Sequence, residues 1–301
     1  MKKIIIVALA LTGITYCSLA QGFYFRIGLG YALPQAGQTI DGNAIPYSGS
    51  RTNTTYLQTY NIKSASFTSG TQSTSGFGYQ FTEHIAAQLD AAFGLSTTTY
   101  TFADNNITFS GYNANGSYVQ RANNSIILEP SIVLQSGGSS SVNVYTRIGL
   151  AIPVITKITE ENNYYIPSLP TNVDLTYQIS NSFSLGFNAA AGLQYKMNDR
   201  MNLWGEISML SLSLFIKESV LKSFTEDGVT YPLDSIGGPH KVTYSKNVSV
   251  DTNYAKLPTY SQPFSNIGIM IGFTFRLSHK AGYSARKHDV DIDENKPFRR
   301  R

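Results

Sequence analysis

The chain has 301 residues, of which 14% are charged and 42% hydrophobic, against about 25% and about 45 to 50% in typical soluble domains. Its net charge is +4 and it holds a single cysteine, which excludes a disulfide framework and a cysteine-ligated metal site. No window offers about 18 uninterrupted apolar residues, so a membrane protein built from helices is also excluded.

The N-terminus predicts an exported protein. Two lysines precede an apolar run from Ile4 to Ile14, and Ser18-Leu19-Ala20 supplies the small residues that a signal peptidase reads. We expect residues 1–20 to be a signal peptide. An uncleaved anchor would need about 20 apolar residues, more than the run provides. A lipoprotein signal at Cys17 is a weaker alternative, because bulky Tyr16 precedes the cysteine.

The charge excess lies at the two ends of the chain. Residues 22–277 carry 14 basic and 15 acidic side chains, while residues 278–301 carry seven basic and four acidic ones. The body is nearly neutral, so the basic net charge gives no reason to expect a nucleic-acid partner. Residues 278–301 have few large apolar side chains and are expected to form a disordered periplasmic tail.

Eight segments of the body alternate apolar with small or polar residues, the pattern of a strand whose two faces differ. In the seventh, the apolar series shifts phase after Met209 and continues through Leu210, Leu212 and Leu214, which predicts a bulge or the membrane rim. The segments are 23–33, 77–81, 85–95, 126–134, 142–154, 183–195, 201–214 and 267–277.

The connections between these segments alternate in length. Those at 82–84, 136–141 and 197–200 are short and rich in turn-forming residues, whereas the others run to roughly 20 to 45 residues. Short turns at one end and long loops at the other are typical of outer-membrane barrels. We therefore predict an all-β fold over residues 21–277: a closed antiparallel transmembrane barrel of eight strands, in an up-and-down meander with short periplasmic turns and long extracellular loops.

The alternative fold is a soluble β-sandwich. In a sandwich the second face meets water and carries Lys and Glu, but here that face is dominated by Gly, Ala and Ser, which suit the inside of a narrow barrel. Outward aromatic residues also gather at the short-turn ends, as an interfacial girdle requires. They are Phe23, Phe25, Tyr79, Phe81, Tyr195, Phe273 and Phe275.

At this point the sequence resembles the small OmpA/OmpX-type outer-membrane barrels. The resemblance covers residues 22–277 as a pattern, and its most specific piece is the last segment, where Asn266, Gly268, Ile271, Phe273 and Phe275 are similar to the signal read by the barrel-assembly machinery. It implies the cell outer membrane as location, and outer-membrane lipid, lipopolysaccharide and that machinery as partners. The chain departs from the family by continuing 26 residues past Phe275.

Six charged residues fall on the predicted inward face. Because a buried charge needs a partner, we predict an ionic network that plugs the lumen, with Glu129 opposite Arg147 across a hairpin centred on Gly138. Tyr145 and Trp204 should help to fill the bore. The alternative is a water-filled lumen that screens each charge. The six residues are Arg26, Asp90, Glu129, Arg147, Glu206 and Arg276.

The sequence offers little for catalysis. The best local triad is Asp234, Ser235 and His240, a combination that loops rich in Ser and Asp supply by chance. No carboxylate cluster indicates a metal site and no glycine loop indicates a phosphate site. We predict no catalytic residues, no cofactor and no metal.

The long loops are the better candidates for recognition, because binding residues often lie on loops held by a rigid scaffold. Loops 34–70 and 217–262 are rich in tyrosine, which suits an extracellular ligand. Alternatively the strands extend beyond the membrane, and Val242 to Val250 could add strands to a ten-stranded barrel. The favoured function is envelope structure or surface binding, the alternative a narrow porin-like channel, and the least favoured a lipid-modifying enzyme. The tyrosines are Tyr47, Tyr56, Tyr60, Tyr231, Tyr244, Tyr254 and Tyr260.

Overall fold

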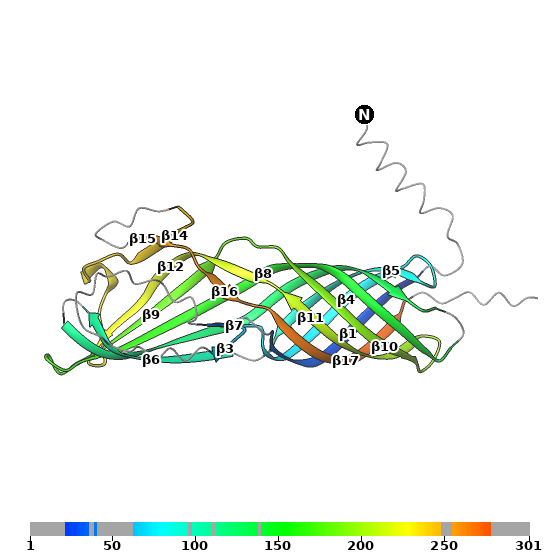
Figure 1. The fold of residues 1–301 in the computed structure, drawn as a ribbon, viewed down its shortest axis with the longest axis horizontal. Coiled ribbons are helices and arrows are strands. Elements are labelled where there is room, and N and C mark those ends of the chain that lie inside the picture. The colour runs from blue at the N-terminus through cyan, green and yellow to red at the C-terminus, as the bar shows by residue number, and fades with distance from the viewer. Residues whose placement is uncertain are drawn as a thin grey trace, which may run out of the picture.

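The fold is seen in a computed structural model (Figure 1). It describes residues 22–35, 39–40, 63–95, 98–109, 112–137, 140–247 and 255–277. Within these ranges no helix is long and apolar enough to cross a membrane. The expected signal peptide, the C-terminal tail and the turn residue Gly138 lie outside the described residues.

Eight strands close into a barrel, and the predicted fold class is confirmed. Each strand pairs antiparallel with the next along the chain, and the last pairs with the first, with Gly28 facing Gly272 across this closing seam. In ring order the strands are β1 (Gly22–Pro34), β4 (Gly70–Gln80), β5 (Ile85–Gly94), β7 (Tyr112–Gln135), β8 (Val142–Ile166), β10 (Gly186–Lys196), β11 (Met201–Ser211) and β17 (Asn266–Arg276).

The structure extends well beyond the ring at the long-loop end, where the remaining strands lie (Figure 1). β7 and β8 are 24 and 25 residues long, and their outer halves continue as a sheet whose other strands stay outside the ring. Eight strands therefore close the barrel, not ten. The outer elements are β2 (Thr39–Ile40), β3 (Lys63–Ser64), β6 (Thr98–Phe109), β9 (Thr171–Asn181), β12 (Ser213–Glu226), β13 (Val229–Thr230), η2 (Leu233–Ser235), β14 (Lys241–Ser245), β15 (Lys256–Pro258) and β16 (Ser261–Pro263).

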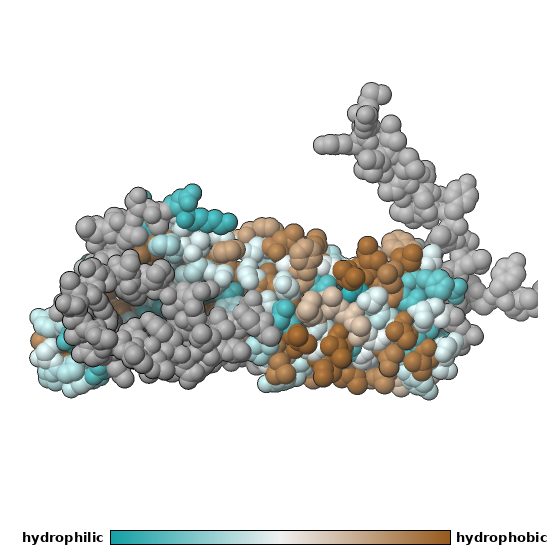
Figure 2. Space-filling view, viewed as in Figure 1, coloured by the Kyte–Doolittle hydropathy of each residue, from teal (hydrophilic) through white to brown (hydrophobic). Residues whose placement is uncertain are grey.

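The two faces of the ring strands differ as the alternation predicts. Along β17 the outward Ile269 is 70% exposed, whereas the inward Met270 beside it is 6% exposed. Figure 2 shows hydrophobic side chains gathered over the part of the molecule that holds the ring. An apolar band on the outside of a closed barrel is what lipid requires, because the strand hydrogen bonds are satisfied within the wall.

The apolar series changes phase after Met209 as predicted, but no bulge accompanies the change, and the membrane rim as its cause stays a prediction. Inward positions keep the same parity from Asn202 to Ile216, and the residue spacing does not slip. What changes is the chemistry of the interior, from polar at Glu206 to apolar at Leu210 and beyond. The register first slips between Ile216 and Glu218, where β12 pairs with β9, and slips again between Leu221 and Ser223.

The apolar stretch from Leu210 to Ile216 helps to close the ring at its long-loop end. Its side chains pack with a segment from the end of the first long loop, whose Phe67 is 2% exposed. Thr68 holds this segment in place, because its hydroxyl donates to the Phe264 carbonyl at 2.6 Å and accepts from the Asn266 amide at 2.7 Å. We call this group the apolar cap; it comprises Ala65, Phe67, Ala122, Ile127, Ala151, Ile158, Ile179, Leu210, Leu212, Leu214, Ile216 and Phe264.

Candidate functional site

Below the apolar cap, five charged side chains meet in the middle of the lumen. They come from five different strands, and all are at least 94% buried. Arg147 binds three carboxylates: Glu129 at 3.0 Å, Glu206 at 3.0 Å and Asp90 at 3.6 Å. Arg26 binds the other oxygen of Glu206 at 2.5 Å. We call Arg26, Asp90, Glu129, Arg147 and Glu206 the lumen cluster.

Two aromatic side chains complete the lumen cluster at its periplasmic side. The guanidinium carbon of Arg26 lies 3.5 Å from the centre of the Trp204 ring, and Trp204 is 1% exposed. Tyr145 donates its hydroxyl to Glu206 at 2.7 Å and lies 5.6 Å from Arg26 by its ring centre. Both residues therefore take part in the charge network as well as in filling the bore.

Glycines make room for these large side chains. A Cβ atom at Gly28 or Gly272 would overlap the Trp204 ring, and one at Gly192 would lie 2.9 Å from the Tyr145 ring. Eight strands leave an interior only wide enough for side chains to fill, so a small residue must face each large one. The glycine-rich inward face is thus explained by packing.

The lumen cluster has more acid than base. Three carboxylates face two guanidinium groups, and Asp90 and Glu129 lie directly opposite each other on neighbouring strands. Like charges in that position repel unless a partner lies between them. Arg147 supplies that partner, and Gln88 adds a hydrogen bond by donating its amide to Asp90 at 2.5 Å.

Five of the six charged residues predicted to face inward meet in the lumen cluster, but two details differ from the prediction. Arg147 faces Val133, so it is not opposite Glu129; because Gln135 faces Tyr145, the hairpin is centred later than Gly138. Arg147 still reaches Glu129, because tilted strands bring residues of different register to one height. Arg276 is partly exposed near the periplasmic end of β17 and makes no ion pair with a described residue.

Sequence reasoning missed a hydrogen-bonded extension of the network. Tyr24 donates its hydroxyl to Gln88 at 2.9 Å, and Gln88 in turn binds Asp90. Both residues sit on the inward face that the alternation defines, so the signal was present. Neither carries a formal charge, so the rule that a buried charge needs a partner does not single them out.

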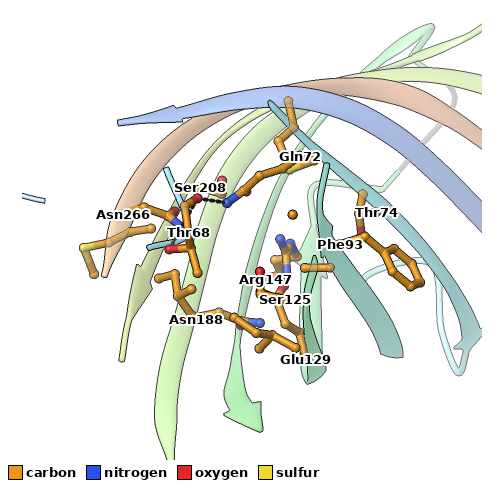
Figure 3. Close-up of a pocket in the computed structure, with 16 residues that line it drawn as sticks. Thr68, Gln72, Thr74, Phe93, Ser125, Glu129, Arg147, Asn188, Ser208 and Asn266 are labelled. Atoms are coloured by element: carbon orange, nitrogen blue, oxygen red, sulfur yellow. Dashed lines mark hydrogen bonds and ion pairs between the residues drawn. The ribbon is translucent and has the colours of Figure 1, made fainter. Parts of the chain in front are cut away.

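A polar chamber lies between the lumen cluster and the apolar cap (Figure 3). It encloses about 20 Å³ and is lined by Thr68, Thr74, Asn188 and Glu129 among others. Both side-chain polar atoms of Asn188 and the Thr74 hydroxyl are buried with no hydrogen-bond partner among the described residues. A second cavity of about 40 Å³, lined in part by Arg26 and Arg276, lies on the periplasmic side. Each has room for about one to three water molecules.

The aromatic residues expected to form a girdle cover one side of the barrel. Phe23 and Tyr79 lie 4.8 Å apart, Phe25 and Phe77 5.1 Å apart, and Tyr79 and Phe81 5.1 Å apart by their ring centres. These contacts join β1, β4 and the turn that follows β4. Phe273 and Phe275 continue the patch on β17, and Tyr195 stands apart on β10.

The residues expected to form an assembly signal lie on β17, which closes the barrel by pairing with β1. Asn266 is buried and holds Thr68, and Gly268 faces inward. Ile271, Phe273 and Phe275 point outward from the same strand. Their recognition by an assembly machinery stays a prediction.

The triad of Asp234, Ser235 and His240 is not assembled. The Ser235 hydroxyl donates to the Pro232 carbonyl at 2.6 Å, and the His240 ring contacts the Ile236 carbonyl at 3.0 Å. The Ser235 and His240 side chains are therefore engaged with local backbone carbonyls. In the part of the chain that the structure describes, no group of three or more His, Cys, Asp or Glu side chains could hold a metal ion.

The fold and the lumen define a transmembrane β-barrel with a side-chain-filled interior. No protein-family model matches the sequence, and no curated protein matches it. Solved structures with some similarity include OprG from Pseudomonas aeruginosa, with 13% identity over 87% of this chain and 97% of that chain and a TM-score of 0.42. A major outer membrane protein from Thermus thermophilus shows 10% identity over 85% and 98%, with a TM-score of 0.37. Ail, the attachment invasion locus protein of Yersinia pestis, shows 8% identity over 85% and 97%, with a TM-score of 0.28.

Proposed function

We propose that the protein is an integral outer-membrane barrel with a sealed lumen, and that it acts in envelope structure or surface binding through its extracellular sheet. One observation carries this proposal. Arg147 binds carboxylates from three other strands, and the apolar cap lies above these ion pairs. A lumen crossed by two such layers leaves no continuous path for a solute. The work of the protein then falls to surfaces outside the lumen.

The location in the outer membrane is supported by the outer face of the ring. Phe187, Ile207, Ile269 and Ile271 are all more than half exposed, although they are large and apolar. Such a band is stable in lipid and would aggregate in water. The predicted barrel, residues 21–277, would follow an export signal, and lipid and lipopolysaccharide would surround the ring.

Surface binding is supported by the length of the outer sheet, which presents strands and loops beyond the ring. Loops 34–70 and 217–262 remain our candidate ligand regions. Within the second loop, Tyr244 and Tyr260 pack against the apolar cap with ring centres 6.0 Å apart, so both serve the fold. Tyr231 is 40% exposed and is the better candidate contact. The other tyrosines of these loops, Tyr47, Tyr56, Tyr60 and Tyr254, lie outside the described residues.

Single-channel recording in planar bilayers tests the sealed lumen. We expect the wild-type protein to insert without stepwise conductance. The matched variant Glu206→Ala removes the carboxylate that joins Arg26 to Arg147, and we expect it to show conductance steps. The variant Glu83→Ala, at an exposed turn, should stay silent like the wild type. Sustained conductance of the wild-type protein would contradict the proposal.

A narrow channel is the second candidate, and the two lumen cavities favour it. Cavities of about 20 and 40 Å³ lie on either side of the lumen cluster, so a rearrangement of that cluster could join them. Conduction would then depend on Arg147 changing partners. Recordings of wild-type protein that switch between silent and conducting levels would favour this candidate.

A further inference from the structure

The barrel wall is interrupted where the ring meets the outer sheet. β9 ends at Asn181 and β10 begins at Gly186, and the ladder to the neighbouring strands jumps from Ile216 facing Asn181 to Ser211 facing Phe187. Between these points the Ser182 amide donates to the Phe215 carbonyl at 2.7 Å. No strand pairing covers residues 183–185.

A cleft of about 620 Å³ opens at this interruption. Apolar side chains form one part of its lining, and Phe183 and Phe187 are 78% and 63% exposed. Hydroxyl groups form another part of the lining, and four of them come from Ser182, Ser184, Ser211 and Ser213. The hydroxyls of Ser245 and Thr259 already donate to backbone carbonyls. A surface of this kind offers room for an acyl chain together with donors for a polar headgroup.

The height of the cleft places it at the outer rim of the membrane. On β10 the outward residues run from Tyr195, near the short turn, to Phe187, and Phe183 follows beyond the strand. About 10 residues of a tilted strand span the apolar band of a barrel. The cleft therefore lies where acyl chains end and headgroups begin.

Three exposed lysines come from segments that border this cleft. Lys246 is part of the lining, and its ammonium group lies 5.4 Å from the centre of the Phe215 ring. Lys217 follows the lining residue Ile216, and Lys157 follows Thr156, whose carbonyl accepts a hydrogen bond from Asn181 at 3.1 Å. All three are exposed, and none makes an ion pair with a described residue. The nearby Glu218 is already bound by Lys241 at 2.5 Å.

We propose that this cleft binds a phosphorylated, multiply acylated lipid of the outer leaflet. Its acyl chain lies against Phe183, Leu185 and Phe187, and its phosphate lies among Lys157, Lys217 and Lys246. The inference rests on the proposed location in the outer membrane and adds a defined lipid site to it. Unpaired cations above an apolar cleft fit an anionic amphiphile, since each end of the ligand meets matching chemistry.

Tryptophan fluorescence provides a direct test, because the native Trp204 is buried in the lumen and gives a constant background. Phe183→Trp places a reporter in the cleft, and Ile269→Trp places a matched reporter on the lipid-exposed face of β17. The full-length proteins are inserted into vesicles of brominated phosphatidylcholine, which quenches both reporters. Unbrominated lipid A, a diphosphorylated glycolipid, is then titrated. We expect it to relieve quenching at position 183 at a far lower mole fraction than at position 269.

The lysines are tested in the Phe183→Trp background. The triple variant Lys157→Gln, Lys217→Gln, Lys246→Gln should need roughly 100-fold more lipid A, since each lysine near an anionic surface contributes about a factor of five. The control triple Lys196→Gln, Arg200→Gln, Lys222→Gln makes the same charge change at exposed positions outside the cleft, and should behave like the parent.

Three results would overturn the lipid site. The first is equal relief of quenching at positions 183 and 269, and the second is an unchanged lipid A titration in the cleft triple variant. The third is loss of the relief at position 183 when inorganic phosphate is added at the phosphate concentration that lipid A supplies, which would indicate a site for phosphate alone. Failure of the proposed function looks different: quenching would then be absent at position 269 because the ring would not lie in the bilayer.

Discussion

The guanidinium group of Arg26 lies over the ring of Trp204 at 3.5 Å while binding Glu206 at 2.5 Å. The flat guanidinium cation of Arg26 stacks on an aromatic ring, and its N–H groups donate to a carboxylate. It joins β1 to β11, two strands that are separated in the ring by β17. The lumen cluster thus ties the wall together across the bore as well as around it.

Loss of the shared acceptor in the lumen cluster should be costly. Glu206→Gln leaves the buried Arg26 without its carboxylate partner, while Arg147 keeps Glu129 and Asp90. Removal of one partner of a buried pair costs about 3 to 5 kcal/mol. The free energy of unfolding in urea, measured in phospholipid vesicles, checks this value. Arg276→Gln is the control, because Arg276 has no ionic partner among the described residues, and it should change stability by less than about 0.5 kcal/mol. A loss below about 1 kcal/mol for Glu206→Gln would mean that water screens the lumen.

Glu129 and Arg147 should be energetically coupled. Their side chains lie 3.0 Å apart and are buried, so a double-mutant cycle with Glu129→Gln and Arg147→Gln should give a coupling energy of about 1 to 3 kcal/mol. Asp90, 3.6 Å from Arg147, compensates in part and keeps the value below that of an isolated pair. The same cycle with Arg276→Gln in place of the Arg147 variant should give no coupling. A Glu129 and Arg147 coupling below about 0.5 kcal/mol would rule out the ionic plug.

The glycines that face Trp204 should not tolerate a methyl group. In Gly28→Ala the new Cβ atom overlaps the indole and lies 3.1 Å from the Ile271 carbonyl oxygen, and overpacking of this kind costs about 1 to 3 kcal/mol. Gly205→Ala is the matched control on the outer face, where the nearest atom is 3.9 Å away. We expect it to be neutral or to stabilise by up to about 1 kcal/mol, since alanine has less backbone freedom to lose than glycine. Equal effects of the two substitutions on thermal unfolding would show that Trp204 does not fill the lumen as described.

Stability of the outer sheet should depend on pH through Glu160. Removal from water raises the pKa of this carboxyl, and the hydrogen bonds from Gln120 and Asn162 oppose that shift only in part. Because the folded protein holds the proton more tightly than the unfolded chain, stability falls as pH rises above the ordinary value near 4.5.

Glu160→Gln should remove this dependence. The variant should be more stable than the wild type at about pH 8, which is well above the ordinary pKa of a Glu carboxyl. Below about pH 4, which is under that pKa, the two proteins should be equally stable. The new side-chain amide at position 160 can also donate to the side-chain oxygen Oδ1 of Asn162, which has no partner among the described residues. Proteolysis of the outer sheet across this pH range measures the effect, with Glu161→Gln, at an exposed ion pair with Arg121, as the control. A wild-type sheet equally resistant at both pH values would contradict the assignment.

Much of the ring could be predicted because a strand in lipid obeys a strict local rule. Every second residue of 267–277 faces hydrocarbon, so the alternation of the sequence directly reports the wall, and β17 was found almost to the residue. The outer sheet was harder to predict. Its strands lack a hydrophobic constraint as strong, so the alternation predicts long loops at β9 and over the outer halves of β7 and β8. Strands that extend beyond the membrane are predicted only as an alternative.

For the lumen, the alternation alone predicts which charges face inward, because parity along a strand is a local property. Which of these charges pair depends on how the strands are arranged in three dimensions. Barrel shear sets which residues share a height, so Arg147 meets Glu129 although its neighbour in the ladder is Val133, while Arg276 at the rim meets no described acid. The same holds for the apolar cap, where a loop segment around Phe67 and the Leu210 to Ile216 stretch meet from distant parts of the chain. Contacts of that kind depend on closure of the ring, which no local pattern encodes.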